Sequence, residues 1–260
     1  MSAFINFPIT CKIQIQIALI SASLFFIWGC MSTPPAISPI HSIPYIHPSE
    51  KKPDTLIVFL HGKGGKTSDF DKAGFIETVR AKGFLVDMIA VNGHLGYYFK
   101  RNLIERLRND IIKPALTKGY KHIWFVGVSL GGLGSMLYSM NYPEEVDGIL
   151  LMAPFMGNSG SIEMIVKSGG VRNWDPETAR IKTWQKELWN YIKEVTSRSD
   201  SKPQIYLAYG TDDEYGPTSE VLEEVIPQGR VFKSKGGHNW RDWTPLWKEF
   251  LDNSPLPRIQ

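Results

Sequence analysis

The chain has 260 residues, of which 43% are hydrophobic, and a formal net charge of +3 at neutral pH. This composition is ordinary for a globular protein, and the length fits one sizeable α/β domain better than two small ones. The sequence contains neither a long basic block nor a groove-reading motif, so no nucleic-acid partner is expected.

The N-terminal segment has one charge in its first thirty residues, Lys12, followed by an apolar run over residues 13–28. The run is about fifteen residues long, short of the roughly twenty that a membrane-spanning helix needs. Its length suits the apolar region of a secretory signal, so residues 1–29 are expected to be a signal peptide.

The end of this run, with Gly29 before Cys30, resembles the lipobox of bacterial lipoproteins. The resemblance implies a mature chain that starts at a lipid-modified Cys30, in the bacterial cell envelope, with membrane contact through that anchor alone. An uncleaved anchor, plain secretion and a buried N-terminal helix remain alternatives. Besides Cys30 the sequence has only Cys11, so a mature chain starting at Cys30 has no internal disulfide.

Five prolines occur between residues 34 and 48, in an otherwise polar or small stretch. Repeated proline keeps a segment extended and out of helices, which predicts a tether over residues 30–52. The folded domain is then expected over residues 53–254, with a tail at 255–260.

From residue 55 onward, short apolar runs alternate with longer segments of helical period. The runs predict strands at 55–60, 84–91, 123–128, 148–152, 204–209 and 230–232. The periodic segments predict helices at 70–82, 102–118, 130–140, 219–225 and 243–251. This order predicts an α/β fold with a mostly parallel sheet of about six strands and helices on both faces. Catalytic groups in such sheets gather at the carboxyl ends of the strands.

Ser129 lies at the centre of the motif G-x-S-x-G, between the predicted strand 123–128 and the predicted helix 130–140. A sharp turn between a strand and a helix strains the serine backbone and needs small flanking residues. In return it presents the hydroxyl at the top of the sheet. The motif in this context makes Ser129 a candidate nucleophile.

A serine hydroxyl is a weak nucleophile at neutral pH and needs a base, which is itself oriented by an acid. His238 follows the last predicted strand in a glycine-flanked loop, and it is the one histidine after Ser129 in the sequence. Three carboxylates follow the strand at 204–209: Asp212, Asp213 and Glu214. The residues alone leave the choice among these three open.

A glycine-rich loop at residues 61–65 follows the first of these predicted strands. Glycines let a backbone approach a substrate, so this loop can supply an N–H group to a developing oxyanion. Its lysines do not have the spacing of a Walker phosphate loop. His61 is expected to brace the loop rather than to act as a second base.

Four features occur in this order, each after a predicted strand: the glycine-rich loop at 61–65, the serine motif, the carboxylates at 212–214 and His238. Together they resemble the α/β-hydrolase superfamily over residues 54–252, and in particular its small esterase-type members. The resemblance implies a catalytic triad of Ser129, Asp213 and His238, with Asp212 and Glu214 as less favoured acids. It also implies an oxyanion hole built from the N–H groups of Lys63, or alternatively Gly62, and Leu130. The early antiparallel strands of the full fold are not evident in this sequence, so a sheet reduced to about six strands is expected.

Residues 157–202 form an insertion where such hydrolases often carry a lid, with a predicted helix at 177–194. This helix is expected to dock on the domain, with a substrate-covering cap and a membrane contact as alternatives. Phe155 and Tyr98 are candidate substrate-binding residues because each lies just after a predicted strand.

Taken together, these features predict a serine hydrolase that cleaves carboxylic acyl esters through an acyl-enzyme intermediate. The partner is expected to be a small-molecule or lipid-like acyl substrate. No cofactor is expected, and no histidine pair has metal-ligand spacing. A thioesterase, an acyltransferase or a peptidase with the same triad remains an alternative, as does a catalytically silent binding lipoprotein.

Overall fold

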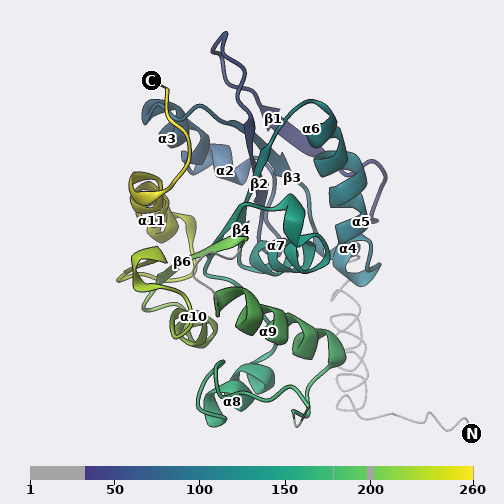
Figure 1. Ribbon diagram of the computed structural model, residues 1–260, viewed down its shortest axis with the longest axis vertical. Coiled ribbons are helices and arrows are strands. Elements are labelled where there is room, and N and C mark those ends of the chain that lie inside the picture. The colour runs from purple at the N-terminus through teal and green to yellow at the C-terminus, as the bar shows by residue number, and fades with distance from the viewer. Residues whose placement is uncertain (1–32, 178, 198–201, 260) are drawn as a thin grey trace, which may run out of the picture. The chain divides into compact units, whose positions relative to one another are not determined.

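Seven strands form one sheet at the centre of the molecule, in the order β1-β3-β2-β4-β5-β6-β7 (Figure 1). The computed structural model describes residues 33–177, 179–197 and 202–259, and the compact unit that holds the sheet begins at Pro35. The strands are β1 (Ser42–Tyr45), β2 (Thr55–Leu60), β3 (Asp87–Val91), β4 (His122–Val128), β5 (Gly148–Met152), β6 (Gln204–Gly210) and β7 (Val231–Ser234). All neighbours pair in parallel except β1, which runs antiparallel to β3.

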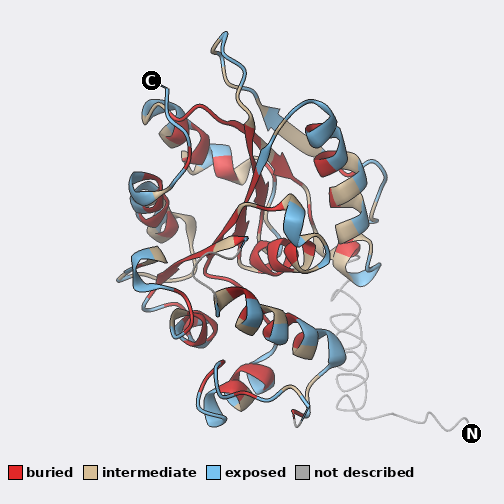
Figure 2. Ribbon diagram, in the orientation of Figure 1, coloured by how far each residue is buried: buried red, intermediate tan, exposed pale blue. Residues whose placement is uncertain are grey.

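The central strands are buried on both faces because their side chains alternate between two apolar cores. Val58 and Phe125 face one core, whereas Phe59 and Val126 face the other. Such continuous apolar strands are typical of a parallel sheet that is covered on both sides. Figure 2 shows the central strands buried along most of their length and α7 buried almost throughout, whereas most of the other helices carry both buried and exposed residues.

Helices cover both faces of the sheet. The first core lies under α5 (Leu103–Arg106), π-helix η1 (Leu107–Ile112), α6 (Lys113–Thr117), α7 (Leu130–Asn141), α8 (Ser159–Lys167), α9 (Thr183–Thr196) and α10 (Gly216–Glu223). The second core lies under α2 (Asp69–Lys72), α3 (Phe75–Ala81) and α11 (Trp240–Asn253). The short helix α4 (Leu95–Phe99) follows β3, and single 3₁₀ turns occur at η2 (Pro143–Glu145) and η3 (Gln228–Arg230).

The predicted fold class is confirmed, and the strands expected from residue 55 onward are all present, but the sheet has seven strands rather than about six. The additional strand is β1, at residues expected to be part of a tether. It pairs with β3 from Ser42 opposite Val91 to Tyr45 opposite Met88. The expected start of the folded domain at residue 53 was therefore too late. Ile40, which is 3% exposed, already packs in the first core.

The insertion after β5 contains two helices, α8 and α9, rather than the single one that was expected. α9 buries Leu188, Trp189 and Ile192 in the first core, beside residues of β5 and α7. It is thus a docked helix, and its first turn leaves Trp184 36% exposed.

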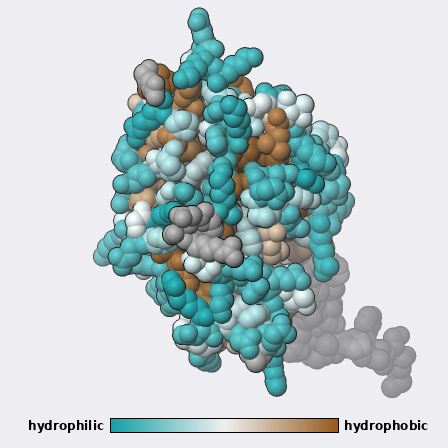
Figure 3. Space-filling view, in the orientation of Figure 1, coloured by the Kyte–Doolittle hydropathy of each residue, from teal (hydrophilic) through white to brown (hydrophobic). Residues whose placement is uncertain are grey.

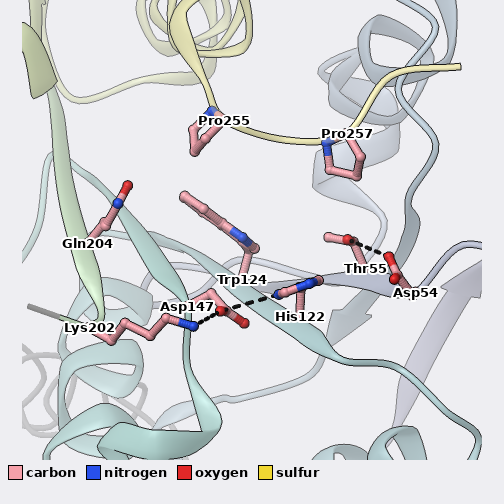
Figure 4. A pocket seen from close by; sticks show the side chains of 9 residues that line it. All are labelled: Asp54, Thr55, His122, Trp124, Asp147, Lys202, Gln204, Pro255 and Pro257. Carbon is pink, nitrogen blue, oxygen red and sulfur yellow. Dashed lines mark hydrogen bonds and ion pairs between the residues drawn. The ribbon is translucent and has the colours of Figure 1, made fainter. Parts of the chain in front are cut away.

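The amino edge of the sheet is held together by Asp147, which precedes β5. Its carboxylate accepts hydrogen bonds from the Ile123 N–H at 3.0 Å and from Lys202 at 2.6 Å. The His122 imidazole lies 3.3 Å from the same carboxylate. The side chains of His122, Asp147 and Lys202 line a pocket of about 330 Å³, together with Trp124 and two prolines (Figure 4). Burial alone would raise the pKa of Asp147, but the bonds from Lys202, His122 and Ile123 outweigh it and lower the pKa below its ordinary value.

The signal peptide expected at residues 1–29, and Cys30, lie outside the described residues. Within the described part of the chain, no helix combines the length and the apolar character needed to cross a membrane. The face drawn in Figure 3 is largely hydrophilic, with apolar side chains interspersed among polar ones.

Candidate active site

Ser129 occupies a strained turn between β4 and α7. Its backbone has φ 51° and ψ −115°, a conformation that favours glycine. The turn is held in place because the Ser129 N–H donates to Met152 O at 2.9 Å, while Ser129 O accepts from the Phe155 N–H at 3.0 Å. The strain is thus imposed by the neighbouring strand β5 and the segment that follows it.

The two glycines of the motif are needed for close backbone packing. A Cβ atom on Gly127 would lie 2.5 Å from Gly131 O, and one on Gly131 would collide with Leu60 O. Neither position therefore tolerates a side chain without a shift of backbone. The sequence motif is explained by this contact between β4, the start of α7 and the end of β2.

The structure brings Asp213 and His238 together at the same sheet edge as Ser129. His238 Nδ1 lies 2.8 Å from Asp213 Oδ2. The Asp213 side chain is 2% exposed, and its other oxygen accepts the Tyr215 N–H at 2.8 Å. Of the three candidate carboxylates, Asp213 is the one that contacts His238, whereas Asp212 and Glu214 are exposed.

The His238 ring is held between two aromatic rings. Tyr215 and Trp243 both lie with their centroids 4.8 Å from that of the imidazole, in edge-to-face arrangements. Within the described residues, Ser129 Oγ makes no hydrogen bond, to His238 or to any other group. Catalytic hydrogen bonds are often long without substrate and shorten when the substrate binds.

The glycine-rich loop after β2 lies directly against Ser129. A Cβ atom on Gly62 would be 3.2 Å from the Ser129 Cβ. The backbone N–H groups of Lys63, in this loop, and of Leu130, at the first position of α7, donate no hydrogen bond within the described part of the chain. Two free donors beside a candidate nucleophile are what an oxyanion hole requires.

His61 is buried and braces this loop, as expected. Its Nδ1 lies 2.8 Å from Gly62 O and its Nε2 lies 3.1 Å from Asn92 Oδ1. Both ring nitrogens are therefore occupied, and the side chain is 1% exposed. This leaves His61 no free nitrogen with which to act as a base.

A reciprocal cap at the start of α11, which sequence reasoning missed, holds the His238 loop. The Asn239 side chain accepts the Asp242 N–H at 3.2 Å, and Asp242 accepts the Gly237 N–H and the Asn239 side-chain amide, each at 2.8 Å. The Gly237 N–H, then Arg241 and Asn239, lower the pKa of Asp242 to about 2. The polar pair three residues apart before an apolar run was a visible signal for this cap.

A groove of about 950 Å³ opens beside Ser129. Its lining comes from α4, α5, α7, the first turn of α9 and the segment after β5, and it includes both Tyr98 and Phe155. The Tyr98 hydroxyl donates to Leu130 O at 2.8 Å, and burial raises the pKa of Tyr98. Tyr98 therefore braces the turn at Ser129 as well as lining the groove.

Comparison with known proteins agrees with the fold. The profile of a family described as "alpha/beta hydrolase fold" matches residues 102–181. The chain is similar to Est1E from Butyrivibrio proteoclasticus with ferulic acid bound, at 16% identity, with 82% of this chain and 94% of that one covered and a TM-score of 0.52.

Two further solved structures are similar. A predicted CIB-like hydrolase from Thermoplasma acidophilum is 16% identical, with 85% and 96% of the two chains covered and a TM-score of 0.55. FphF, a fluorophosphonate-binding serine hydrolase from Staphylococcus aureus, is 11% identical, with 84% and 98% covered and a TM-score of 0.52. A search of the curated proteins found no match.

Proposed function

The chain has an α/β-hydrolase fold, and on that premise we propose that it is a serine hydrolase of carboxylic acyl esters. The observation that carries the proposal is the pair of His238 and buried Asp213, 2.8 Å apart, at the sheet edge where a strained turn presents Ser129. An acid that fixes the imidazole and a serine exposed on a sharp turn are the parts that acyl transfer requires.

Each group has a defined part in the proposed reaction. Ser129 Oγ attacks the ester carbonyl while His238 Nε2 takes its proton, and Asp213 holds the Nδ1–H tautomer of the ring. The N–H groups of Lys63 and Leu130 stabilise the oxyanion. His238 then gives its proton to the leaving alcohol, and a water molecule, activated by the same ring, hydrolyses the acyl-enzyme and restores the Ser129 hydroxyl.

Labelling with a fluorophosphonate probe tests the nucleophile. The native protein is expected to be labelled once, and Ser129→Ala is expected to lose all labelling. Ser159→Ala, which changes an exposed serine at the start of α8, is the matched control and is expected to label like the native protein. Absence of labelling in the native protein, or equal labelling of Ser129→Ala, would favour a silent binding protein.

The bond cleaved is proposed to be an ester bond, with thioester hydrolysis, acyl transfer and peptide cleavage as the alternatives within the same triad. A matched panel of one acyl group on an activated alcohol, a thiol and an amine separates them. We expect kcat/KM to be highest for the oxygen ester in water. A higher kcat/KM for the thioester or the amide would reassign the reaction.

Export and lipid modification at Cys30 are a further part of the proposal, and they are supported by the sequence alone. The mature protein is expected to start at a lipid-modified Cys30 in the bacterial cell envelope. Intact mass of the membrane-extracted protein tests this. A mature chain that begins at any other residue would remove the lipid anchor from the account.

A further inference from the structure

The groove beside Ser129 follows one face of α7. Leu130, Leu133, Leu137 and Asn141 all line it, and their spacing of three, four and four residues places them on one side of the helix. With a rise of about 1.5 Å per residue, this floor is roughly 16 Å long. The groove is therefore elongated, and it begins at the residue next to the nucleophile.

Three lining residues are joined to the turn that carries Ser129. Leu130 follows Ser129 in the chain, Phe155 donates its N–H to Ser129 O at 3.0 Å, and Tyr98 donates its hydroxyl to Leu130 O at 2.8 Å. The groove thus begins at residues that are bonded to the Ser129 turn.

Among the described residues, none from the acid loop at 211–215 or the histidine loop at 236–242 lines the groove. His238 must reach the oxygen of the leaving alcohol to protonate it, so the alcohol lies on the His238 side of the scissile bond. The acyl group then extends the other way, into the groove.

We propose that this groove binds the acyl chain of an elongated, apolar carboxylic ester and that Leu137 limits the length of chain accepted. The inference rests on the proposed esterase function and deepens it. Leu137 lies seven residues along α7 from Leu130, or roughly 10 Å. Its side chain is half-buried, and it packs against the first core on one side while lining the groove on the other.

The chemistry of the lining selects an uncharged chain. Leu103, Leu130, Leu133, Leu137 and Phe155 contribute apolar surface, whereas the charged lining residues Arg101, Lys182 and Glu187 are exposed. Each methylene buried against such surface contributes about 0.8 kcal/mol, or about fourfold in kcat/KM. Medium-length acyl chains should therefore react faster than acetyl.

The test is a series of p-nitrophenyl esters that share one leaving group: acetate, butyrate, octanoate and dodecanoate. For the native protein, kcat/KM with octanoate is expected to exceed that with acetate by at least about tenfold. Leu137→Trp narrows the groove and is expected to reduce this ratio of octanoate to acetate kcat/KM by about tenfold or more. Leu137→Ala is expected to move the preference towards dodecanoate.

Leu116→Trp is the matched control, because Leu116 is a 39% exposed leucine on α6 that does not line the groove. It is expected to keep the native chain-length profile. A second series consists of acetate esters of increasingly long alcohols. The dependence of kcat/KM on alcohol length should be the same in the native protein and in Leu137→Trp. A change in the alcohol profile in place of the acyl profile would overturn the assignment of the groove.

The inference and the proposed function fail in different ways. If the native protein hydrolyses none of the esters and is not labelled by the fluorophosphonate, the esterase function fails. If it hydrolyses them through Ser129 but Leu137→Trp leaves the octanoate to acetate ratio unchanged, the groove assignment alone fails.

Discussion

The two edges of the sheet differ in how their polar groups are satisfied. At the amino edge, Asp147 accepts hydrogen bonds from the backbone of β4 and from Lys202, and it pairs with His122 (Figure 4). At the carboxyl edge, Ser129 is held in a strained conformation, and the N–H groups of Lys63 and Leu130 donate no hydrogen bond within the described residues.

The difference indicates that the amino edge contributes to the stability of the fold and the carboxyl edge to the reaction. A carboxylate with all its partners present contributes to folding and has little capacity left for a ligand. Strain and unpaired donors cost stability, and they persist where the surrounding structure imposes them for function. The carboxyl edge is therefore the reactive edge, and changes at the two edges should affect different measurements.

The largest effect is expected at Ser129. Ser129→Ala and Ser129→Gly should both lose ester hydrolysis by at least about 10⁴-fold, because the nucleophile is gone. Ser129→Gly should also be about 1 kcal/mol more stable than Ser129→Ala, since glycine adopts a positive φ without strain. Rates with p-nitrophenyl octanoate and urea denaturation of the two variants measure this. Equal unfolding free energies for Ser129→Ala and Ser129→Gly would contradict the claim that the backbone at residue 129 is strained.

The next effect compares two adjacent carboxylates. Asp213→Asn should lower kcat by about 10³- to 10⁴-fold, because His238 loses the partner that fixes its tautomer. Asp212→Asn removes the same charge from an exposed neighbour and should retain most of the activity. If Asp212→Asn proved the more damaging change, the acid would have to be reassigned.

At the amino edge, Asp147→Ala should cost about 2 kcal/mol of unfolding free energy and leave kcat unchanged, because it unpairs the Ile123 N–H and Lys202. The folded-state pKa of Asp147 is depressed, so its contribution is present above the unfolded pKa of about 3.9. The contribution is lost as pH falls through the folded pKa. Native and variant stabilities should therefore converge in acid, and a constant difference would contradict this sign.

The smallest effect concerns the cap that holds the His238 loop. Asn239→Ala should destabilise the protein by about 1 kcal/mol, as loss of a helix cap does. Asn253→Ala, at the other end of α11, is the control and should change stability and activity less. Thermal denaturation and kcat/KM measure both. If Asn239→Ala lowers kcat/KM at a temperature where the variant is still folded, the cap positions His238.

Most of the sheet could be predicted from the sequence because its strands are apolar on both faces and its helices have clear periods. β1 could not, since it is four residues long and contains Pro44. Proline is tolerated in an edge strand but is typical of a tether in a sequence read alone. Pairing with β3, a long-range contact, decides the conformation of this segment.

The site was predictable in its residue types but not in its contacts. Resemblance favoured Asp213 over its neighbours, whereas the physical reason is the turn that buries Asp213 and exposes Asp212. The groove along α7 could not be predicted, because it depends on how α4, α5 and α9 pack around that helix. The short helices α4 and α8 also lacked a sequence period long enough to identify.

The most direct test of the central claim is the mass of the protein during turnover. Native protein mixed with excess p-nitrophenyl octanoate and quenched rapidly in acid should gain the mass of one octanoyl group, on the peptide that contains Ser129. Ser129→Ala should gain none. An unmodified protein during rapid hydrolysis, or an acyl group on another residue, would contradict a reaction through Ser129.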